Sequence, residues 1–157
     1  MQLSDYHGKR NFKKTSEPKG CEVGGNNSKI FVVQKHQASH LHYDFRLAID
    51  GVLKSWAVPK GPSLQPSEKR LAVMTEDHPL EYADFEGTIP EGEYGAGTVE
   101  IWDRGTWEPI SDLSSWLDER KLEFVLHGKK MQGVWVLIGF KNDLKNWLLI
   151  KKKLSVK

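Results

Sequence analysis

The sequence lacks the features typical of secreted and membrane proteins. It has 157 residues but a single cysteine, Cys21, so no internal disulfide can form, as is usual in reducing compartments. A structural zinc site at Cys21 would need further cysteine ligands that the sequence does not have. The polar first residues contain no apolar core of a signal peptide, and no window reaches the length of a membrane span. We therefore expect a cytoplasmic protein with no membrane contact.

The chain also lacks a strong net charge. Lys and Arg number 23, Asp and Glu number 21, and the formal net charge is +2 at pH 7. Net charge alone therefore argues only weakly for a nucleic-acid partner. Basic residues do cluster near both ends, at Lys9, Arg10, Lys13 and Lys14 and again at residues 151–153. Such clusters are usually solvated, and they become phosphate contacts only where they flank a site.

The sequence does contain enough apolar residues for the core of one domain. Its hydrophobic fraction is 38%, with six Trp and six Phe, which is typical of a globular protein. Short apolar runs separated by Gly, Pro, Asn and Asp predict many strands. The predicted strands cover residues 29–35, 40–49, 52–58, 70–76, 98–102, 106–109, 121–126, 132–140 and 146–151.

Turn residues predict how these strands connect. The Asp50-Gly51 pair is the strongest hairpin signal, and the Asp-Arg-Gly at residues 103–105 predicts another hairpin. Residues 111–120 predict one helix, capped by Ser111 or Asp112. About eight strands with one short helix predict a mainly β protein, folded as a compact closed or nearly closed β-barrel.

Three segments need separate interpretation. Residues 1–28 are polar and Gly-rich, and we expect an irregular amino-terminal arm ahead of a single barrel domain over 29–157. Residues 77–97 form a long connection, and such loops are usually functional. Within it, the Gly-rich stretch 90–97 lacks the Lys-Ser/Thr ending and following helix of a phosphate-binding loop. We interpret that stretch as tight turns leading into a strand.

The most informative stretch runs from His40 to Leu47, where polar and apolar residues alternate. Side chains of a strand alternate between its two faces, so His42, Asp44 and Arg46 share one face while apolar residues share the other. An ordinary amphipathic strand would present Lys, Thr, Ser or Glu to water. Imidazole, carboxylate and guanidinium groups in one row instead indicate a metal ion or an anion.

A divalent metal is the first interpretation of this row. His42 and Asp44 are two residues apart on one strand face, and His36 lies just upstream across a short turn. Two histidines and one carboxylate with open positions suit a catalytic divalent metal. The alternative is a surface strand with incidental histidines, since histidine is often found half-buried without a special role.

Anion binding is the second interpretation. Arg46 shares the face of His42 and Asp44, and Lys60 and Arg70 lie at the ends of neighbouring predicted strands. Arginine suits bidentate phosphate recognition and lysine suits point-charge contact. His78 could donate a proton or a hydrogen bond to phosphate, or it could be an ordinary loop histidine.

Several motifs in order make the sequence recognisable. They are His42-Tyr43-Asp44-Phe45-Arg46-Leu47, the run at residues 51–63, the run at 70–73, Glu76-Asp77-His78-Pro79-Leu80, and the runs at 85–87 and 102–107. They closely resemble the 3′-phosphoesterase module of bacterial DNA ligase D. Because the sequence contains no polymerase or ligase module, we expect the free-standing, archaeal-type version of that module. Residues 9–18 also match the family's amino-terminal motif, except that Asn11 stands where an Asp is usual.

The resemblance implies a β-barrel with a polar crescent-shaped site and a Mn²⁺-dependent enzyme, with Co²⁺ or Zn²⁺ as alternative metals. Such an enzyme removes a 3′-terminal ribonucleoside from a DNA or RNA primer end and then hydrolyses the 3′-phosphate that remains. Its expected partners are nucleic-acid 3′ ends and a separate ligase and polymerase of the same repair pathway.

The resemblance also implies three sets of site residues, carried over position by position. The metal ligands would be His36, His42 and Asp44. The other catalytic positions would be Arg46, Lys60, Arg70, Glu76, His78 and Tyr82. The substrate-binding positions would be Gln34, Arg10 and Glu17.

Two other functions remain open from the residues alone. A set of two histidines and one carboxylate on a barrel also binds Fe(II) in oxygenases, where the second histidine usually lies far downstream, as His127 does. A non-enzymatic nucleic-acid-binding barrel would expose aromatic side chains on its strand faces. It would leave the histidines and the aspartate unexplained.

Overall fold

The computed structural model describes residues 3–18 and 29–153, and Cys21 lies outside them. No helix in these two ranges is long and apolar enough to cross a membrane. The elements in chain order are α1 (Ser4–Gly8), β1 (Ile30–Gln37), β2 (Leu41–Ile49), β3 (Val52–Val58), β4 (Lys69–Met74), the 3-10 helix η1 (Leu80–Asp84), β5 (Gly87–Ile89), β6 (Gly97–Pro109), α2 (Trp116–Glu119), β7 (Lys121–His127), β8 (Gln132–Gly139) and β9 (Asn146–Lys151).

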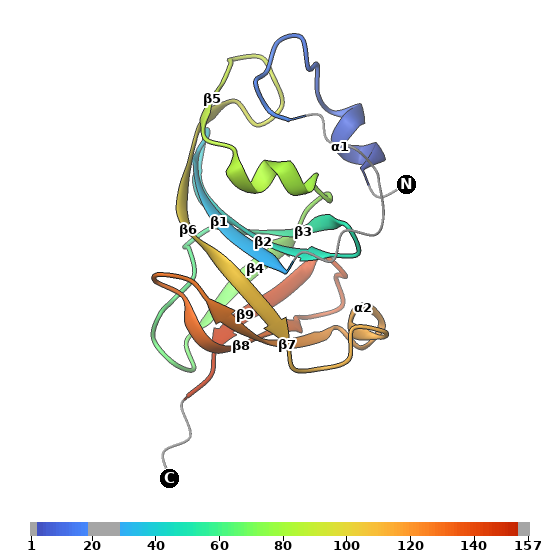
Figure 1. Ribbon diagram of the computed structural model, residues 1–157, viewed down its shortest axis with the longest axis vertical. Coiled ribbons are helices and arrows are strands. Elements are labelled where there is room, and N and C mark those ends of the chain that lie inside the picture. The colour runs from blue at the N-terminus through green and yellow to red at the C-terminus, as the bar shows by residue number, and fades with distance from the viewer. Residues whose placement is uncertain (1–2, 19–28, 154–157) are drawn as a thin grey trace.

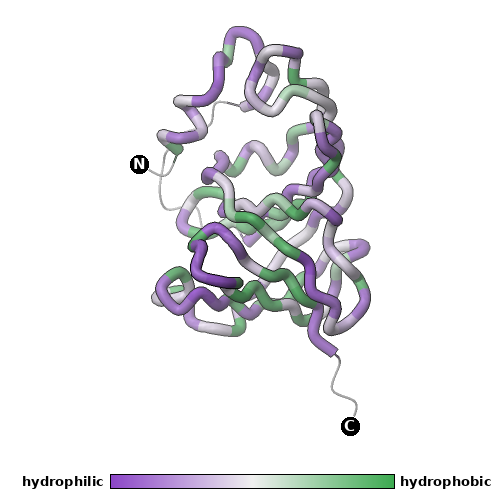
Figure 2. The backbone as a smooth tube through the Cα atoms, turned by 180° about the vertical axis from the view of Figure 1, so that it is seen from behind, coloured by the Kyte–Doolittle hydropathy of each residue, from purple (hydrophilic) through white to green (hydrophobic). Residues whose placement is uncertain are grey.

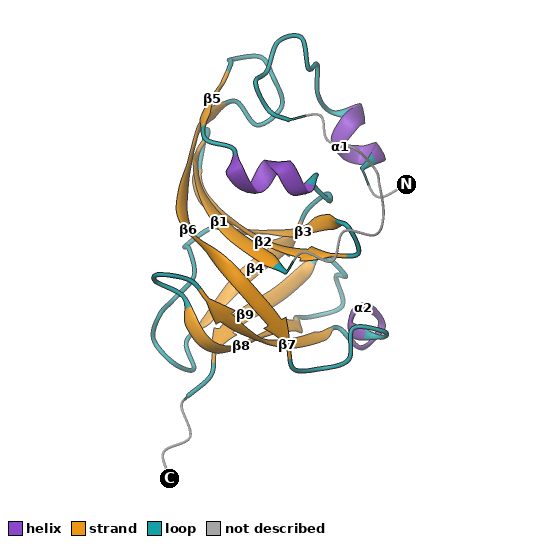
Figure 3. Cartoon of the chain, viewed as in Figure 1, coloured by secondary structure: helices purple, strands orange, loops and turns teal. Residues whose placement is uncertain are grey.

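The strands form one antiparallel sheet that closes on itself (Figure 1). The strand order is β1-β2-β3-β4-β9-β8-β7-β6, and β6 pairs back with β1 to close the barrel. The short strand β5 adds to the free side of β6. The cartoon in Figure 3 shows the long strands β1, β2 and β6 continuing beyond the barrel toward η1 and the amino-terminal arm. The prediction of a closed β-barrel of about eight strands is confirmed.

The hairpin between β2 and β3 forms where the sequence predicted it. Asp50 and Gly51 have positive φ angles of 53° and 84°, as a two-residue type I′ turn requires. The turn sets the register, with Ile49 opposite Val52. This register brings the outward-facing residues of β1, β2 and β3 into one continuous row of side chains.

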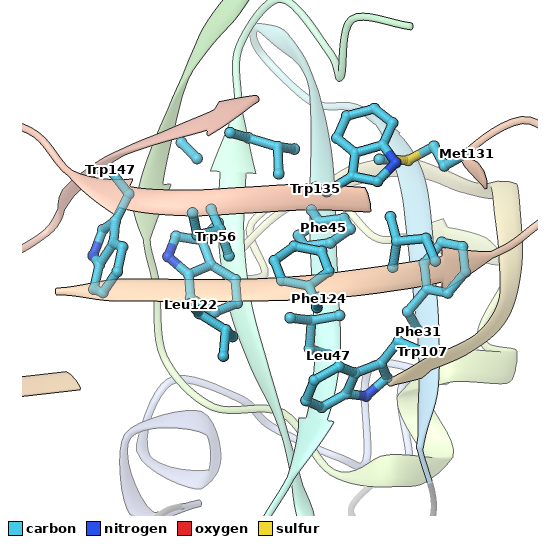
Figure 4. Close-up of a cluster of buried hydrophobic side chains, with 14 of the residues drawn as sticks. Phe31, Phe45, Leu47, Trp56, Trp107, Leu122, Phe124, Met131, Trp135 and Trp147 are labelled. Carbon is cyan, nitrogen blue, oxygen red and sulfur yellow. The ribbon is translucent and has the colours of Figure 1, made fainter. Parts of the chain in front are cut away.

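The barrel interior is the main hydrophobic core (Figure 4). Trp56, Trp107, Trp135 and Trp147 are at most 1% exposed, so these four tryptophans are packing residues of the core. Burying a large apolar side chain stabilises a fold by roughly 1.5–3 kcal/mol. Figure 2 shows hydrophobic residues concentrated along the barrel strands, whereas the arm is mostly hydrophilic.

A second apolar cluster lies on the outer face of the same strands. Val32, Ala48 and Leu53 belong to it, and they alternate along β1, β2 and β3 with residues of the barrel core. They are covered by η1 through Tyr82 and by the arm through Tyr6. The outer face of β1–β3 is therefore a buried surface beneath η1 and the arm, and it is this face that carries the polar row.

The arm is more ordered than the sequence indicated. The irregular segment predicted for residues 1–28 contains helix α1, and Leu3 and Tyr6 are fully buried. Thr15 and Glu17 are buried as well. Residues 3–18 therefore pack against the domain as part of it, because the sheet offers an apolar and polar surface that the sequence pattern of the arm alone could not reveal.

The predicted hairpin over residues 98–109 is wrong, because β6 crosses this region as one strand. Asp103 instead accepts hydrogen bonds from the backbone N–H groups of residues 129–131. Gly105 permits close approach of β7, since a Cβ atom there would lie 2.1 Å from the carbonyl oxygen of His127. Asp103 and Gly105 thus contact β7 and the turn that follows it, and the sequence pattern alone cannot distinguish such residues from those of a turn.

The predicted helix over residues 111–120 is too long, because only the four residues of α2 are helical. Both predicted caps bind elsewhere. The Ser111 hydroxyl accepts the N–H of Glu123 in β7, and the Asp112 carboxylate accepts a backbone N–H two residues ahead. The helix ends at Arg120, which has a left-handed φ of 54°.

Candidate active site

A pocket opens on the outer face of β1–β3, between the arm and the loop that joins β5 to β6. Most of the predicted site residues line it, and they are Arg10, His36, His42, Asp44, Arg46, Glu76, His78 and Tyr82. The long connection over residues 77–97 contributes two of these, His78 and Tyr82, and also Ile89, Tyr94 and Gly95.

The candidate metal ligands converge at one end of this pocket. His36 and His42 are cross-strand partners in the β1–β2 hairpin, and Asp44 lies two residues further along β2. The ligand atoms of the three residues all lie within 4.8 Å of one another. The Asp44 carboxylate lies 3.5 Å from Nδ1 of His36 and 3.3 Å from Nε2 of His42. Two imidazoles and one carboxylate that converge in this way form a donor set suited to a divalent ion.

Backbone carbonyls orient both histidines. The Gly95 carbonyl oxygen lies 2.7 Å from Nε2 of His36, and the His40 carbonyl oxygen lies 3.2 Å from Nδ1 of His42. A carbonyl oxygen can only accept, so each of these two nitrogens is the donor in its contact. In each ring the other nitrogen faces Asp44, where it can coordinate a metal once it carries no proton.

The charges in the cluster are coupled. Although burial opposes ionisation of Asp44, the Arg46 guanidinium and the two imidazoles hold the pKa of its carboxyl well below the usual range. The hydrogen bond to Asp44 raises the pKa of His42. Asp44 is therefore an anion at neutral pH, and a cation bound here would compete with the proton on His42.

Arg46 is a buried cation beside the cluster. It is 3% exposed, and its Nε donates to the Gln34 side-chain oxygen at 2.7 Å. One terminal nitrogen lies 3.4 Å from the Asp44 carboxylate, and the other lies 3.2 Å from Nδ1 of His78. Its guanidinium carbon lies 4.9 Å from the ring centroid of Tyr82. These contacts fix the guanidinium next to the place where a metal-bound anion would lie.

Arg10 brings a second buried cation from the arm. Its Nε donates to Glu17 at 2.9 Å, and one terminal nitrogen donates to Glu76 at 3.1 Å. The other terminal nitrogen lies 3.3 Å from Nε2 of His78. The arm therefore forms part of the pocket wall.

His78 lies between the two arginines and is neutral. Burial, followed by the nearby Arg46 and Arg10 charges, lowers its pKa well below the ordinary 6.5. Its Nδ1 lies 3.0 Å from the carbonyl oxygen of Glu76 and 3.2 Å from Arg46, and its Nε2 lies 3.3 Å from Arg10. A neutral imidazole has one N–H group and one acceptor nitrogen, so it accepts from one of the two arginines. The resting imidazole thus helps to orient a cation and is not itself charged.

Two predicted substrate-binding residues lie behind the pocket wall. Gln34 donates to the Tyr82 carbonyl oxygen at 2.7 Å while accepting from Arg46. Glu17 accepts from the Tyr82 hydroxyl at 2.9 Å and from Arg10. Burial raises the pKa of Tyr82 well above its ordinary value, so its hydroxyl stays protonated. Gln34 and Glu17 hold the residues that line the pocket but do not line it themselves.

Two predicted catalytic residues are not brought into the pocket. In β4, Val73 pairs with the pocket-lining Ala57, so Arg70, of opposite parity, lies on the barrel-core face of that strand. A terminal nitrogen of Arg70 lies 3.5 Å from Glu68. Lys60 is exposed in the turn that follows β3. The sequence placed both near strand ends but could not show which face or turn they occupy.

The structure adds site contacts that the sequence interpretation missed. Gly92 and Gly95 have positive φ angles of 87° and 76°, which confirms the predicted tight turns. The sequence interpretation did not foresee two features of this loop. Its Gly95 carbonyl orients His36, and its Tyr94 lies at the pocket rim. A Cβ atom at Gly95 would lie 3.5 Å from Cε1 of His36. The run of glycines was the available signal of a close backbone approach.

Asn11 lies outside this pocket. Its side chain is exposed, and its Oδ1 accepts the backbone N–H of Lys13 at 3.1 Å. A carboxylate oxygen could accept the same hydrogen bond. The departure from the usual aspartate is therefore compatible with the same local turn and leaves the pocket lining unchanged.

Comparison with known proteins agrees with this geometry. Residues 34–139, which include the metal cluster, Arg46, His78 and Tyr82, match the DNA Ligase D 3′-phosphoesterase domain. The chain belongs to the DNA ligase D 3′-phosphoesterase family. The resemblance inferred from the sequence motifs is confirmed.

Relatives in this family are long proteins. The chain is 52% identical over 155 residues to the multifunctional non-homologous end joining protein LigD of Pseudomonas aeruginosa, covering 96% of this chain and 18% of that protein. It is 46% identical over 160 residues to the Mycolicibacterium smegmatis protein of the same name, covering 97% of this chain and 21% of that protein. The chain thus spans about a fifth of the relatives it matches.

Proposed function

We propose that this protein is a Mn²⁺-dependent 3′-end phosphoesterase that removes 3′-terminal ribonucleosides and 3′-phosphates from DNA or RNA primer ends. The observation that carries the proposal is the cluster of His36, His42 and Asp44 beside Arg46, in a chain of the DNA ligase D 3′-phosphoesterase family. Hydrolysis of a phosphoester requires an activated water and positive charge around the phosphoryl oxygens. The pocket offers residues for both.

Nδ1 of His36, Nε2 of His42 and the Asp44 carboxylate would hold the divalent ion. When bound, the ion offsets charge on a phosphoryl oxygen and lowers the pKa of a coordinated water. Two imidazoles and a carboxylate with open positions suit Mn²⁺, with Co²⁺ or Zn²⁺ as alternatives. The contacts of both rings with backbone carbonyls support this assignment, because neither ring has to flip before binding.

Arg46 and Arg10 would bind the remaining phosphoryl oxygens. Both guanidiniums line the pocket and are held by side chains behind it. A guanidinium keeps its charge at every pH of interest and can offer two parallel N–H groups to a phosphate. The preorganised contacts to Gln34 and Glu17 reduce the entropy lost when substrate binds.

His78 would stabilise the phosphoryl group rather than donate a proton to the leaving group. Its neutral resting state supports this role, because a proton donor needs a pKa close to the working pH. We expect His78→Ala to lower the rates for good and poor leaving groups by similar factors. A defect that grows with the pKa of the leaving group would show that His78 is a general acid instead.

The structure gives the other two functions little support. His127, the downstream histidine that an Fe(II) oxygenase could use, pairs with Glu108 at 2.6 Å and does not line the pocket. A binding barrel would expose aromatics on its strands, yet in residues 3–18 and 29–153 the one exposed large aromatic, Tyr94, lies in a loop. We therefore retain the phosphoesterase as the proposed function.

The proposed partners follow from the family. The relatives are named as multifunctional non-homologous end joining proteins, so we propose that this protein heals 3′ ends for a separate ligase and polymerase of the same repair pathway. Lys13 and Lys14 are exposed on the arm near Arg10. They are candidates for added contacts to strand phosphates.

The proposal is tested by incubating purified protein with a labelled primer–template that ends in one ribonucleotide. With Mn²⁺ we expect loss of the terminal ribonucleoside, followed by conversion of the 3′-phosphate to a 3′-hydroxyl. EDTA should abolish both steps, and added Mn²⁺ should restore them. A His127→Ala variant is the matched control, since it removes a histidine outside the pocket. Undiminished turnover in metal-free buffer would contradict the proposal.

A further inference from the structure

Tyr94 is an unusual aromatic residue in this protein. It lines the pocket, yet it is 48% exposed, whereas the other pocket tyrosine, Tyr82, is 2% exposed. Among residues 3–18 and 29–153, every other exposed large hydrophobic side chain is aliphatic. An exposed ring at the rim of a polar pocket is available to a ligand that passes over the rim.

The backbone holds Tyr94 in place beside the candidate metal ligands. Its loop contains two turns, closed by hydrogen bonds from Glu93 to Pro90 at 3.2 Å and from Ala96 to Glu93 at 3.1 Å. The next residue, Gly95, gives its carbonyl oxygen to His36. The ring is therefore preorganised near the metal cluster, and a ligand would not have to order a flexible loop.

Two cations from the arm lie against this ring. The guanidinium carbon of Arg10 lies 5.2 Å from the ring centroid, and Arg10 is held in place by Glu17 and Glu76. The second cation, Lys9, is more exposed. Nζ of Lys9 lies 4.8 Å from the Tyr94 ring centroid and 3.5 Å from its hydroxyl. The same ammonium lies 3.5 Å from Glu76. The Lys9 side chain is 42% exposed, and a solvated cation–π contact is weaker than the stacking of a base on an aromatic ring. A base can therefore displace the lysine.

We propose that the base of the 3′-terminal nucleoside stacks on Tyr94 and that Lys9 moves from the ring to a neighbouring strand phosphate. The inference rests on the proposed function, which places the scissile phosphate between the metal cluster and Arg46. The terminal nucleoside then lies on the far side of that phosphate, toward the rim. A strand that already ends in a 3′-phosphate has no such nucleoside, so Tyr94 distinguishes the two substrates of the same pocket.

The test measures binding without turnover, in EDTA, by fluorescence anisotropy of two labelled primer–templates. One ends in a ribonucleoside beyond the scissile phosphate, and the other ends in a 3′-phosphate at the same position. The readout is the ratio of the two affinities in each protein, which removes the difference in charge between the ends. Relative to the wild type, Tyr94→Ala should shift this ratio about tenfold against the ribonucleoside end, the size expected for one lost stacked base.

Two further variants separate stacking from other roles of Tyr94. Tyr94→Phe should keep the wild-type ratio, because a phenyl ring stacks without the hydroxyl that contacts Lys9. Ile110→Ala is the matched control, since it truncates a side chain that is 52% exposed and outside the pocket. The inference is overturned if Tyr94→Ala weakens both substrates equally, or if Tyr94→Phe shifts the ratio as much as Tyr94→Ala does. Because binding is read in EDTA, a protein without turnover in Mn²⁺ would contradict the proposed function and still test this inference.

Discussion

The two faces of β2 bury their residues about equally but by different means. Phe45 and Leu47 face the barrel interior and are fully buried among apolar side chains. Asp44 and Arg46 face outward, yet they are only 7% and 3% exposed. On the inner face, burial itself stabilises the fold. On the outer face, burial is unfavourable unless each charge has a partner, and Asp44 and Arg46 partner each other at 3.4 Å.

On this strand, low solvent exposure alone does not distinguish residues of the hydrophobic core from residues of the candidate site. A carboxylate that has lost its water but kept strong positive neighbours is ready to bind a cation. A guanidinium held by Gln34 and Tyr82 is ready to bind an anion. Substitutions on the outer face should therefore affect activity first, and those on the inner face should affect stability first.

The largest expected effect is on activity, from the outer face. His42→Ala should lower phosphodiesterase and phosphomonoesterase rates about 1000-fold or more, because a bound metal supplies several kcal/mol of transition-state stabilisation. Asp44→Ala should do the same. The two variants should differ in stability without metal. The His42 side chain is 25% exposed, whereas removing Asp44 leaves the buried Arg46 without its carboxylate.

Thermal melts in EDTA check this difference. The melting temperature of His42→Ala should stay close to the wild type, and that of Asp44→Ala should fall. Near-native rates in either variant would show that the ligand assignment is wrong.

The next effect is on stability, from the inner face. Phe45→Ala removes a ring that is fully buried in the barrel core, and such truncations cost about 3–5 kcal/mol of unfolding free energy. Urea unfolding measures the loss. At a temperature where the variant is still folded, its turnover should remain far above that of Asp44→Ala. If Phe45→Ala were as inactive as Asp44→Ala while folded, the two faces would not be functionally distinct.

Substitutions and deletions in the arm should affect both stability and activity. Deleting residues 1–14 should lower both stability and activity, because it removes the fully buried Leu3 and Tyr6 together with the pocket residue Arg10. A double substitution of Lys13 and Lys14 by Gln is the milder version. Both lysines are exposed, so this variant should keep its stability while the dependence of substrate affinity on salt becomes flatter. If the dependence of substrate affinity on salt were unchanged, these two lysines would not contact substrate phosphates.

The smallest effect concerns pH. Because burial, Arg46 and Arg10 lower the pKa of His78 in the folded state, the unfolded chain binds more protons below pH 6.5. The contribution of His78 is therefore fully present above that pH and is lost as the pH falls. The slope of unfolding free energy reaches at most about 1.4 kcal/mol per pH unit for one proton. Between pH 6.5 and 5, His78→Gln should flatten this slope in EDTA, and an equally steep slope would contradict a neutral His78.

Local patterns predicted the parts of the fold that depend on neighbouring residues. The alternation in β2 and the Asp50-Gly51 turn depend on backbone geometry within a few residues, and both are confirmed. Asp103 and Gly105 are residue types of the same kind, but they lie within strand β6 and contact β7 and the turn that follows it. No local pattern contains that information, so the predicted hairpin failed.

The site residues that depend on local patterns or on motif resemblance could be predicted from the sequence, and those that depend on strand register or on docking of the arm could not. His42, Asp44 and Arg46 are set by the parity of one strand, and motif resemblance added Arg10 and Glu76 from distant segments. Arg70 depends on the register of β4 against β3, which a single sequence does not give. Lys60 depends on the direction of an exposed turn. The contact of Lys9 with Tyr94 depends on how the arm docks, and nothing in the arm's own sequence specifies that surface.

The outer face of the β1–β2 hairpin is proposed to hold a catalytic metal. The most direct test is a titration of Mn²⁺ into the protein, with free Mn²⁺ followed by electron paramagnetic resonance. The wild type and the His127→Ala control should each bind one ion per chain, and His42→Ala should bind none at the same concentrations. Binding of one ion by His42→Ala with wild-type affinity would contradict the account, because it would place the metal away from His36, His42 and Asp44.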